Sequence, residues 1–203
     1  MRHSSSACRA QLLQVNTLPE QPWKNGGGSL REIACHPPGA GFADFDWRIS
    51  LALVSGPGQF SLFPGVDRHI VLIEGKSMLL HDNEQNRTHT LLPLEPYTFA
   101  GEASMRSQPQ GCVLDLNLML RRGRAQGRLH AWHGSDKSSA TLNSGFHVLY
   151  AAQGRYQLQL DGHDWRLSAG QALVAECSAP VRLRCLADTT PAALVHAAID
   201  APS

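Results

Sequence analysis

Glycine and proline interrupt this chain about every ten residues, and no stretch between them sustains a long helical period. The intervening segments are short apolar runs, or runs in which apolar and polar residues alternate. In WRISLALV (47–54), for example, Trp47, Ile49 and Leu51 share one face of an extended strand. Short strands separated by turn residues at this spacing are typical of β-sandwiches and barrels. We therefore predict an all-β fold with little helix.

Two segments repeat one order of elements: an apolar strand, a glycine turn, an alternating strand, a polar turn and a further strand. They are HIVLIEGKSMLLHDNEQNRTHTLLPLEPYTFAGE (69–102) and FHVLYAAQGRYQLQLDGHDWRLSAGQALVAE (146–176). The rhythm is that of a jelly-roll barrel of the cupin type, so we predict a bicupin with two cupin-like β-barrel halves; chance similarity between hairpins is the alternative. We expect a disordered N-terminus (1–10), a first half (11–120), a connection (121–139) and a second half (140–203), with strands shared between the halves.

The composition fits a folded protein that does not bind nucleic acid. The chain has 203 residues, of which 42% are hydrophobic and 17% charged, so a substantial core can form. A net charge of +1 argues against affinity built from many phosphate contacts. The basic run RRGRAQGR (121–128) carries no interleaved aromatic residue, and we interpret it as a solvated connection.

The cysteines and the N-terminal residues indicate a reducing compartment. There are five scattered cysteines and no Cys-x-x-Cys pair, so we expect reduced thiols rather than a disulfide framework or a zinc knuckle. The first ten residues lack the apolar stretch of a signal peptide, and no apolar run approaches membrane-spanning length. We therefore expect a soluble cytoplasmic protein with no membrane partner.

The metal ligands of cupins are absent from this sequence. Metal-binding members carry a His-x-His pair and a glutamate ahead of the hairpin glycine, but the seventh position before Gly75 is Arg68. A guanidinium there would repel a cation and could clamp a carboxylate with two parallel hydrogen bonds. The alternative is a structural ion pair with Asp67 or Glu74. We expect no metal and no cofactor.

Three consecutive glycines follow Lys24 and Asn25 in PWKNGGGSLREIA (22–34). A Walker loop would need the lysine after the glycines, and a dinucleotide fingerprint would need spaced glycines between a strand and a helix. SLREIA instead alternates as a strand does. We interpret the glycines as the start of a strand whose backbone comes close to a ligand or to a neighbouring strand.

Four separated motifs together resemble the HutD/Ves family: PWKNGGGSLREIA (22–34), FSLFPGVDR (60–68), YTFAGE (97–102) and VLDLNLMLRRG (113–123). They occur in the family's order, and the resemblance covers roughly residues 11–200. It implies a bicupin without a catalytic metal and a role in histidine utilisation, with urocanate or a formylglutamate-like intermediate as the ligand. Ves-type members of the family are linked to stress responses instead.

A polar stripe in the last of these motifs suggests a binding surface. In VLDLNLML (113–120), Asp115, Asn117 and Met119 share one face of a strand, and leucines occupy the other. We interpret the stripe as facing a pocket; a solvent face is the alternative. The candidate ligand-binding residues are Lys24, Asn25, Gly26, Gly27, Gly28, Arg31, Phe63, Asp67, Arg68, Phe99, Asp115, Asn117, Met119 and Arg121.

From the residues and the resemblance together we predict a non-enzymatic protein that binds a small anionic metabolite. It would sense or buffer an intermediate of histidine utilisation, and we expect a homodimer as the default oligomer. The alternatives are a metal-free isomerase or hydrolase with Asp67, His69 or Asp115 as acid or base, a stress-related protein of the Ves type, and a protein that binds partners through its barrel faces.

Overall fold

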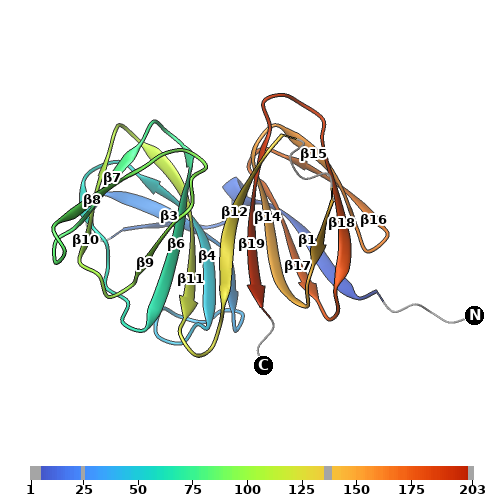
Figure 1. Ribbon diagram of the computed structural model, residues 1–203, viewed down its shortest axis with the longest axis horizontal. Helices are drawn as coiled ribbons and strands as arrows, with labels where there is room; N and C mark the ends of the chain where they lie inside the picture. Colours follow the sequence, from blue (N-terminus) through green and yellow to red (C-terminus); the bar gives the residue numbers. More distant parts are fainter. Residues whose placement is uncertain (1–5, 24–25, 135–138, 201–203) are drawn as a thin grey trace, which may run out of the picture. The chain divides into compact units, whose positions relative to one another are not determined.

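The computed structural model describes residues 6–23, 26–134 and 139–200, and these confirm the all-β prediction (Figure 1). Lys24 and Asn25 lie outside the described residues. The short 3-10 helix η1 spans Val15–Thr17. Among the described residues, no helix is long and apolar enough to cross a membrane. The chain divides into two compact units: an N-terminal barrel unit, Thr17–Leu129, and a C-terminal barrel unit, Met1–Asn16 with His130–Ser203.

The N-terminal barrel unit is built from two antiparallel sheets. One has six strands in the order β2-β3-β4-β11-β6-β9, and the other has four in the order β5-β10-β7-β8. The strands are β2 (Glu20–Pro22), β3 (Gly28–His36), β4 (Trp47–Val54), β5 (Gly58–Gln59), β6 (Val66–Glu74), β7 (Met78–Asp82), β8 (Arg87–Leu91), β9 (Tyr97–Ala100), β10 (Met105–Pro109) and β11 (Val113–Arg121). The three central strands β4, β11 and β6 pair over most of their length, and we call them the floor.

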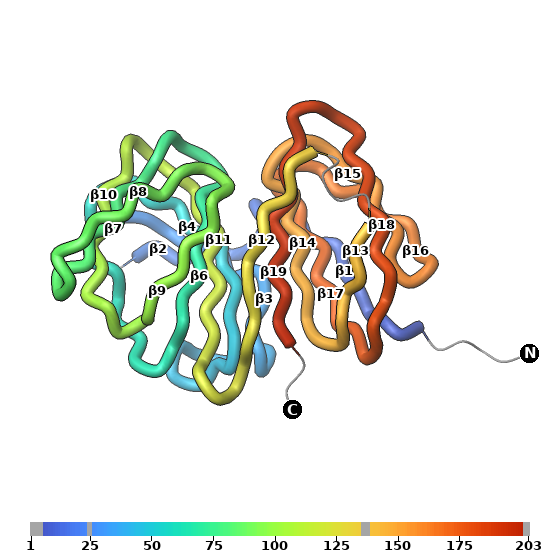
Figure 2. Tube along the Cα trace, in the orientation of Figure 1, coloured from blue at the N-terminus to red at the C-terminus, as the bar shows by residue number. Residues whose placement is uncertain are grey.

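The C-terminal barrel unit also has two sheets, with the orders β1-β17-β14-β19-β12 and β13-β18-β15-β16. Its strands are β1 (Cys8–Gln14), β12 (Gly127–His133), β13 (Ser139–Leu142), β14 (Gly145–Gln153), β15 (Arg155–Leu160), β16 (His163–Ser168), β17 (Gln171–Cys177), β18 (Val181–Ala187) and β19 (Ala193–Asp200). Figure 2 shows the N-terminal strand β1 running beside β17. Residues 8–10, expected to be disordered, belong to β1, and residues 11–16, expected in the first half, belong to the C-terminal barrel unit. The boundary in the middle of the chain falls at 129/130, within β12 and inside the expected connection (121–139).

A disulfide joins β1 to β17, so the expectation that all the thiols are free is wrong. Cys8 and Cys177 are direct partners in the antiparallel register, and their Cα atoms are 4.1 Å apart. The two residues are separated by 169 positions in the sequence. Their pairing depends on which strand lies beside β17, and the spacing of the cysteines does not predict that. This cysteine pair therefore does not support a reducing compartment.

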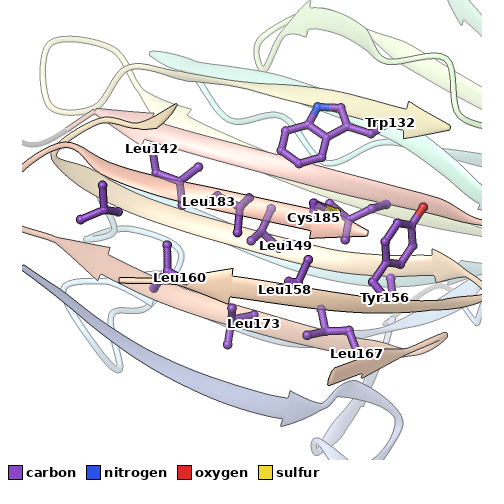
Figure 3. Packing of buried hydrophobic residues seen from close by; sticks show 14 of the residues in the cluster. Trp132, Leu142, Leu149, Tyr156, Leu158, Leu160, Leu167, Leu173, Leu183 and Cys185 are labelled. Carbon is purple, nitrogen blue, oxygen red and sulfur yellow. The ribbon is translucent and has the colours of Figure 1, made fainter. Parts of the chain in front are cut away.

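Apolar side chains from both sheets fill the C-terminal barrel unit (Figure 3). Leu149 and Leu173 come from the five-stranded sheet, and Leu158 and Leu183 face them from the four-stranded sheet. Each of these four side chains is at most 2% exposed. The interior of this barrel is therefore a close-packed hydrophobic core.

The interior of the N-terminal barrel unit changes character from one end to the other. Val54, Leu72 and Val113, on the three floor strands, belong to an apolar cluster with side chains of the opposite sheet. Further along the same inward faces, the residues become polar: Ser50 and Arg48 on β4, and their neighbours on β11 and β6. This polar end of the floor is where a binding site can form.

Candidate functional site

Strand alternation and register bring two arginines together on the inner face of the floor. Met119 of β11 pairs with Arg48 of β4 on one side and with Arg68 of β6 on the other. Two residues along the strand, Asn117 pairs with Ser50. Because side chains at alternate positions share a face, these residues point to the same side of the sheet.

These side chains line a cavity of about 480 Å³ in the N-terminal barrel unit. That volume lies in the range of sites for small molecules and cofactors. The lining residues are Gln21, Pro22, Trp23, Leu30, Phe42, Arg48, Ser50, Ala52, Gln59, Phe60, Ser61, Phe63, Arg68, Asp115, Asn117 and Met119. The cavity thus combines aromatic walls with a few polar groups on the floor strands.

Arg68 is a buried cation without an anionic partner. Its side chain is 5% exposed, and its guanidinium carbon lies 4.6 Å from the ring centre of Phe60, 5.2 Å from that of Phe99 and 5.9 Å from that of Phe63. Among the residues that the structure describes, the buried Nε of Arg68 has no hydrogen-bond partner. Burial lowers the pKa of Arg68 to about 10, and the charge of Asp115 opposes that change. The guanidinium therefore stays charged at neutral pH.

Arg48 is different because its charge is already balanced. Its Nη2 donates to a carboxylate oxygen of Glu32 at 2.6 Å. The guanidinium also stacks on Phe42, with 4.1 Å between its carbon and the ring centre. Of the two arginines in the cavity, Arg68 is thus the one that can accept a new anionic partner without losing an existing one.

Asp115 is the acidic group of the cavity and is almost fully buried. Burial raises its pKa to about 7, although the charge of Arg68 pulls the pKa down. In the described structure no ion pair within 4 Å joins these two groups, and each charge acts on the other over a longer distance. A carboxyl group that titrates near neutrality can exchange a proton under physiological conditions.

The glycine-rich segment serves strand packing and does not line the cavity. A Cβ atom on Gly28 would lie 2.1 Å from the backbone oxygen of Leu53 and 3.0 Å from the Trp23 ring. Ser55 donates both its backbone N–H and its hydroxyl to the oxygen of Gly27. Gly26 adopts a left-handed φ of 71°, and its N–H donates to the oxygen of Trp23. The glycines thus let β3 approach β4 and hold Trp23 against the cavity.

The structure brings together only part of the predicted site. Phe63, Arg68, Asp115, Asn117 and Met119 line the cavity, and Phe99 packs behind Arg68. The remaining described candidates lie elsewhere.

Arg31, Asp67 and Arg121 do not line the cavity. Arg31 pairs with Glu20 at 2.6 Å, because it alternates with the cavity residue Leu30. Asp67 accepts from Arg122 at 2.9 Å, on the face of β6 opposite Arg68. Arg121 follows Met119 in the inward row of β11, but its guanidinium donates to the backbone oxygens of residues 43 and 45 and does not line the cavity.

Several lining residues were not predicted from the sequence. Arg48 and Ser50 interrupt the inward face of an otherwise apolar strand, WRISLALV, and this interruption was a usable signal. Phe42 and Phe60 come from loops, whose course no local periodicity predicts.

Within the described ranges, no group of three or more His, Cys, Asp or Glu side chains is arranged to hold a metal ion. His147 lies seven positions before Gly154, the hairpin glycine of the second repeat. It shares a 3.1 Å hydrogen bond with His196, and its other ring nitrogen lies 3.0 Å from the oxygen of Asn143. Burial lowers the pKa of His147. This buried pair belongs to the core of the C-terminal barrel unit.

Comparison with known proteins places the chain in a family. The HutD family model matches residues 15–194. The chain belongs to the HutD family. Protein Ves of Citrobacter koseri is 37% identical over 150 residues, which are 73% of this chain and 75% of that protein. The resemblance of the four motifs to HutD/Ves proteins is therefore confirmed.

Solved structures agree with this HutD assignment. A conserved protein of unknown function from Pseudomonas aeruginosa PAO1 superposes with a TM-score of 0.85 at 29% identity, over 95% of this chain and 100% of the other. HutD from Pseudomonas fluorescens SBW25, in a formate condition, gives 0.78 at 26% identity with the same coverages. A cupin barrel protein from Leptotrichia buccalis, 9% identical, gives 0.56 over 94% and 96% of the two chains. The cupin-like fold is confirmed.

Proposed function

We propose that this HutD-family protein is a non-enzymatic, cytoplasmic binding protein that senses or buffers a small carboxylate of histidine utilisation. Urocanate and formylglutamate-like intermediates are the compounds we put forward. The observation that carries the proposal is Arg68: a buried guanidinium, charged at neutral pH and without an anionic partner in the described structure, in an aromatic-lined cavity of about 480 Å³. A guanidinium binds a carboxylate through two parallel hydrogen bonds.

The surroundings of Arg68 support a planar acid rather than an inorganic anion. Phe60 and Phe63 present aromatic surface at the guanidinium, and Met119 lies beside it on the floor. Such walls contact a flat organic ligand over a large area. The HutD structure from Pseudomonas fluorescens was obtained in a formate condition, and formate is the smallest carboxylate.

Isothermal titration of the full chain with urocanate, N-formylglutamate and N-formiminoglutamate tests the proposal. We expect at least one to bind, and Arg68→Gln to weaken that binding about 10- to 100-fold, because hydrogen bonds between charged groups are worth roughly 1.5–3 kcal/mol. Arg122→Gln is the matched control, since Arg122 pairs with Asp67 and Glu102 away from the cavity lining and should bind as the wild type does. Folded protein that binds none of the three acids would end the proposal.

A second function, acid–base catalysis, is favoured by one specific observation. Asp115 lines the cavity and its pKa is raised to about 7, as a general acid or base requires. Incubating the same acids with the protein and following their proton NMR spectra separates the two functions. Turnover that Asp115→Asn abolishes would favour an enzyme; binding without turnover supports the binding protein.

A further inference from the structure

The floor of the cavity carries hydrogen-bond acceptors with no donor. Oδ2 of Asp115 and Oδ1 of Asn117 are buried and form no hydrogen bond within the part of the chain that the structure describes. The two residues are 2% and 7% exposed and both line the cavity. A buried acceptor that has no hydrogen-bond donor destabilises the fold. Their presence beside an open cavity therefore points to a ligand that supplies the donor.

The two acceptors lie on β11, and Arg68 lies on the neighbouring strand β6. Met119 is the register partner of Arg68, and Asp115 lies four positions from Met119, so the backbones of Asp115 and Arg68 are offset by about 13 Å along the strands. The charged ends of the Arg68 and Asp115 side chains are close enough for each to shift the pKa of the other. Asn117 lies between Asp115 and Met119, on the same face. A small planar acid with its carboxylate at the guanidinium can extend along this row towards the carboxylate of Asp115.

We propose that Asp115, together with Asn117, determines specificity by accepting a hydrogen bond from the ligand, so that the cavity selects a carboxylate that also carries an N–H or O–H donor at its other end. The inference rests on the proposed function. It narrows the ligand class to acids with an imidazole, amide or similar donor, and it disfavours equally small acids that lack one. In this account Arg68 anchors the acid and Asp115 discriminates among acids.

The charges of the neighbouring groups favour a donor at Asp115. Arg48 is neutralised by Glu32, and Arg68 would be neutralised by the ligand carboxylate. Asp115 would then lose the attraction of an uncompensated cation, and a donor from the ligand is what would stabilise its ionised form. A second anionic group at this position would meet a buried carboxylate and be repelled.

Two matched pairs of acids test the inference by titration calorimetry of the full chain. trans-Urocanate is compared with trans-furylacrylate, which has the same length, planarity and carboxylate but no N–H on its ring. N-Formylglutamate is compared with glutarate, which lacks the amide. We expect the donor-bearing acid of the pair that binds to do so about 10- to 100-fold more tightly than its partner.

Asp115→Leu, which keeps the approximate size and removes both acceptors, should reduce this preference to within about threefold. If Asp115 only balanced the charge of Arg68, the substitution would change the affinities for both acids of a pair by the same factor. The ratio of the two affinities would then stay as in the wild type. Asp67→Asn, on the other face of the sheet, is the control and should keep the wild-type ratio. If the leucine variant does not fold, Asp115→Asn takes its place in these titrations. It should also lower the ratio of the affinities for the donor-bearing and donor-free acids, since it replaces one acceptor with a donor.

The wild-type titrations separate the two proposals without any variant. If the donor-bearing and donor-free acids bind equally, the specificity inference is overturned while carboxylate binding stands. If no acid of either pair binds to folded protein, the proposed function fails. A clear preference in the wild type that survives Asp115→Leu would show that other groups discriminate, and it would overturn the assignment to Asp115.

Discussion

Replacing Asp115 by asparagine should stabilise the protein, and by more as the pH rises. In the folded protein burial raises the pKa of Asp115 from 3.8 to about 7, whereas the unfolded chain loses this proton near pH 4. Between these values the folded state holds more protons than the unfolded state, so the free energy of unfolding falls as the pH rises. Each pKa unit is worth about 1.4 kcal/mol, so ionised Asp115 lowers the free energy of unfolding by on the order of 4 kcal/mol. Asparagine avoids this loss.

Urea denaturation of the wild type and Asp115→Asn, followed by circular dichroism from pH 4 to pH 8, measures this effect. The difference in free energy of unfolding should be smallest near pH 4, grow towards pH 7 and then level off. Carboxyl groups common to both proteins cancel in the difference, and Arg68 stays protonated throughout. Asp67→Asn, an exposed control, should differ from the wild type by no more than about 0.5 kcal/mol. A difference for Asp115→Asn that does not change with pH would refute the reasoning.

Three further predictions concern packing and charge. Leu173→Ala should lower the free energy of unfolding by about 2–5 kcal/mol, because the side chain is fully buried, whereas Leu186→Ala, at a position 56% exposed, should change it by less than about 0.5 kcal/mol; equal urea midpoints would contradict this. Gly28→Ala should lower the melting temperature by several degrees, since its Cβ would lie 2.1 Å from a backbone oxygen. Gly41→Ala, with open space around it, should melt as the wild type does. A wild-type melting temperature for Gly28→Ala would contradict the close contact between β3 and β4. Formate should bind several-fold more tightly at pH 6 than at pH 8, because protonation of Asp115 removes a negative charge from the cavity, and calorimetry that shows no dependence on pH would count against the raised pKa.

The features that follow a local period could be predicted from the sequence. Alternation in 113–121 separates Asp115, Asn117 and Met119 from the leucines, and the structure places this stripe along the cavity. The same alternation, applied to β3, places Arg31 on the face away from the cavity residue Leu30. The glycine segment could be predicted to make a close approach, and only the structure identifies β4 and Trp23 as what it approaches.

What depends on contacts between distant segments could not be predicted. The pairing of β1 with β17, and with it the Cys8–Cys177 disulfide, joins residues 169 positions apart through a strand order that no local pattern contains. Phe42 reaches the cavity from a loop, where no alternation assigns a face. The pairing of Arg48 with Glu32 follows from the neighbouring positions of β3 and β4 in the sheet.

The position of a bound acid in a crystal of the full chain tests the central claim most directly. With urocanate or N-formylglutamate at a saturating concentration, we predict density in the cavity of the N-terminal barrel unit. The carboxylate oxygens should lie about 2.7–3.1 Å from the guanidinium nitrogens of Arg68. An acid bound elsewhere, or a cavity without it at a concentration that saturates binding in solution, would contradict the account.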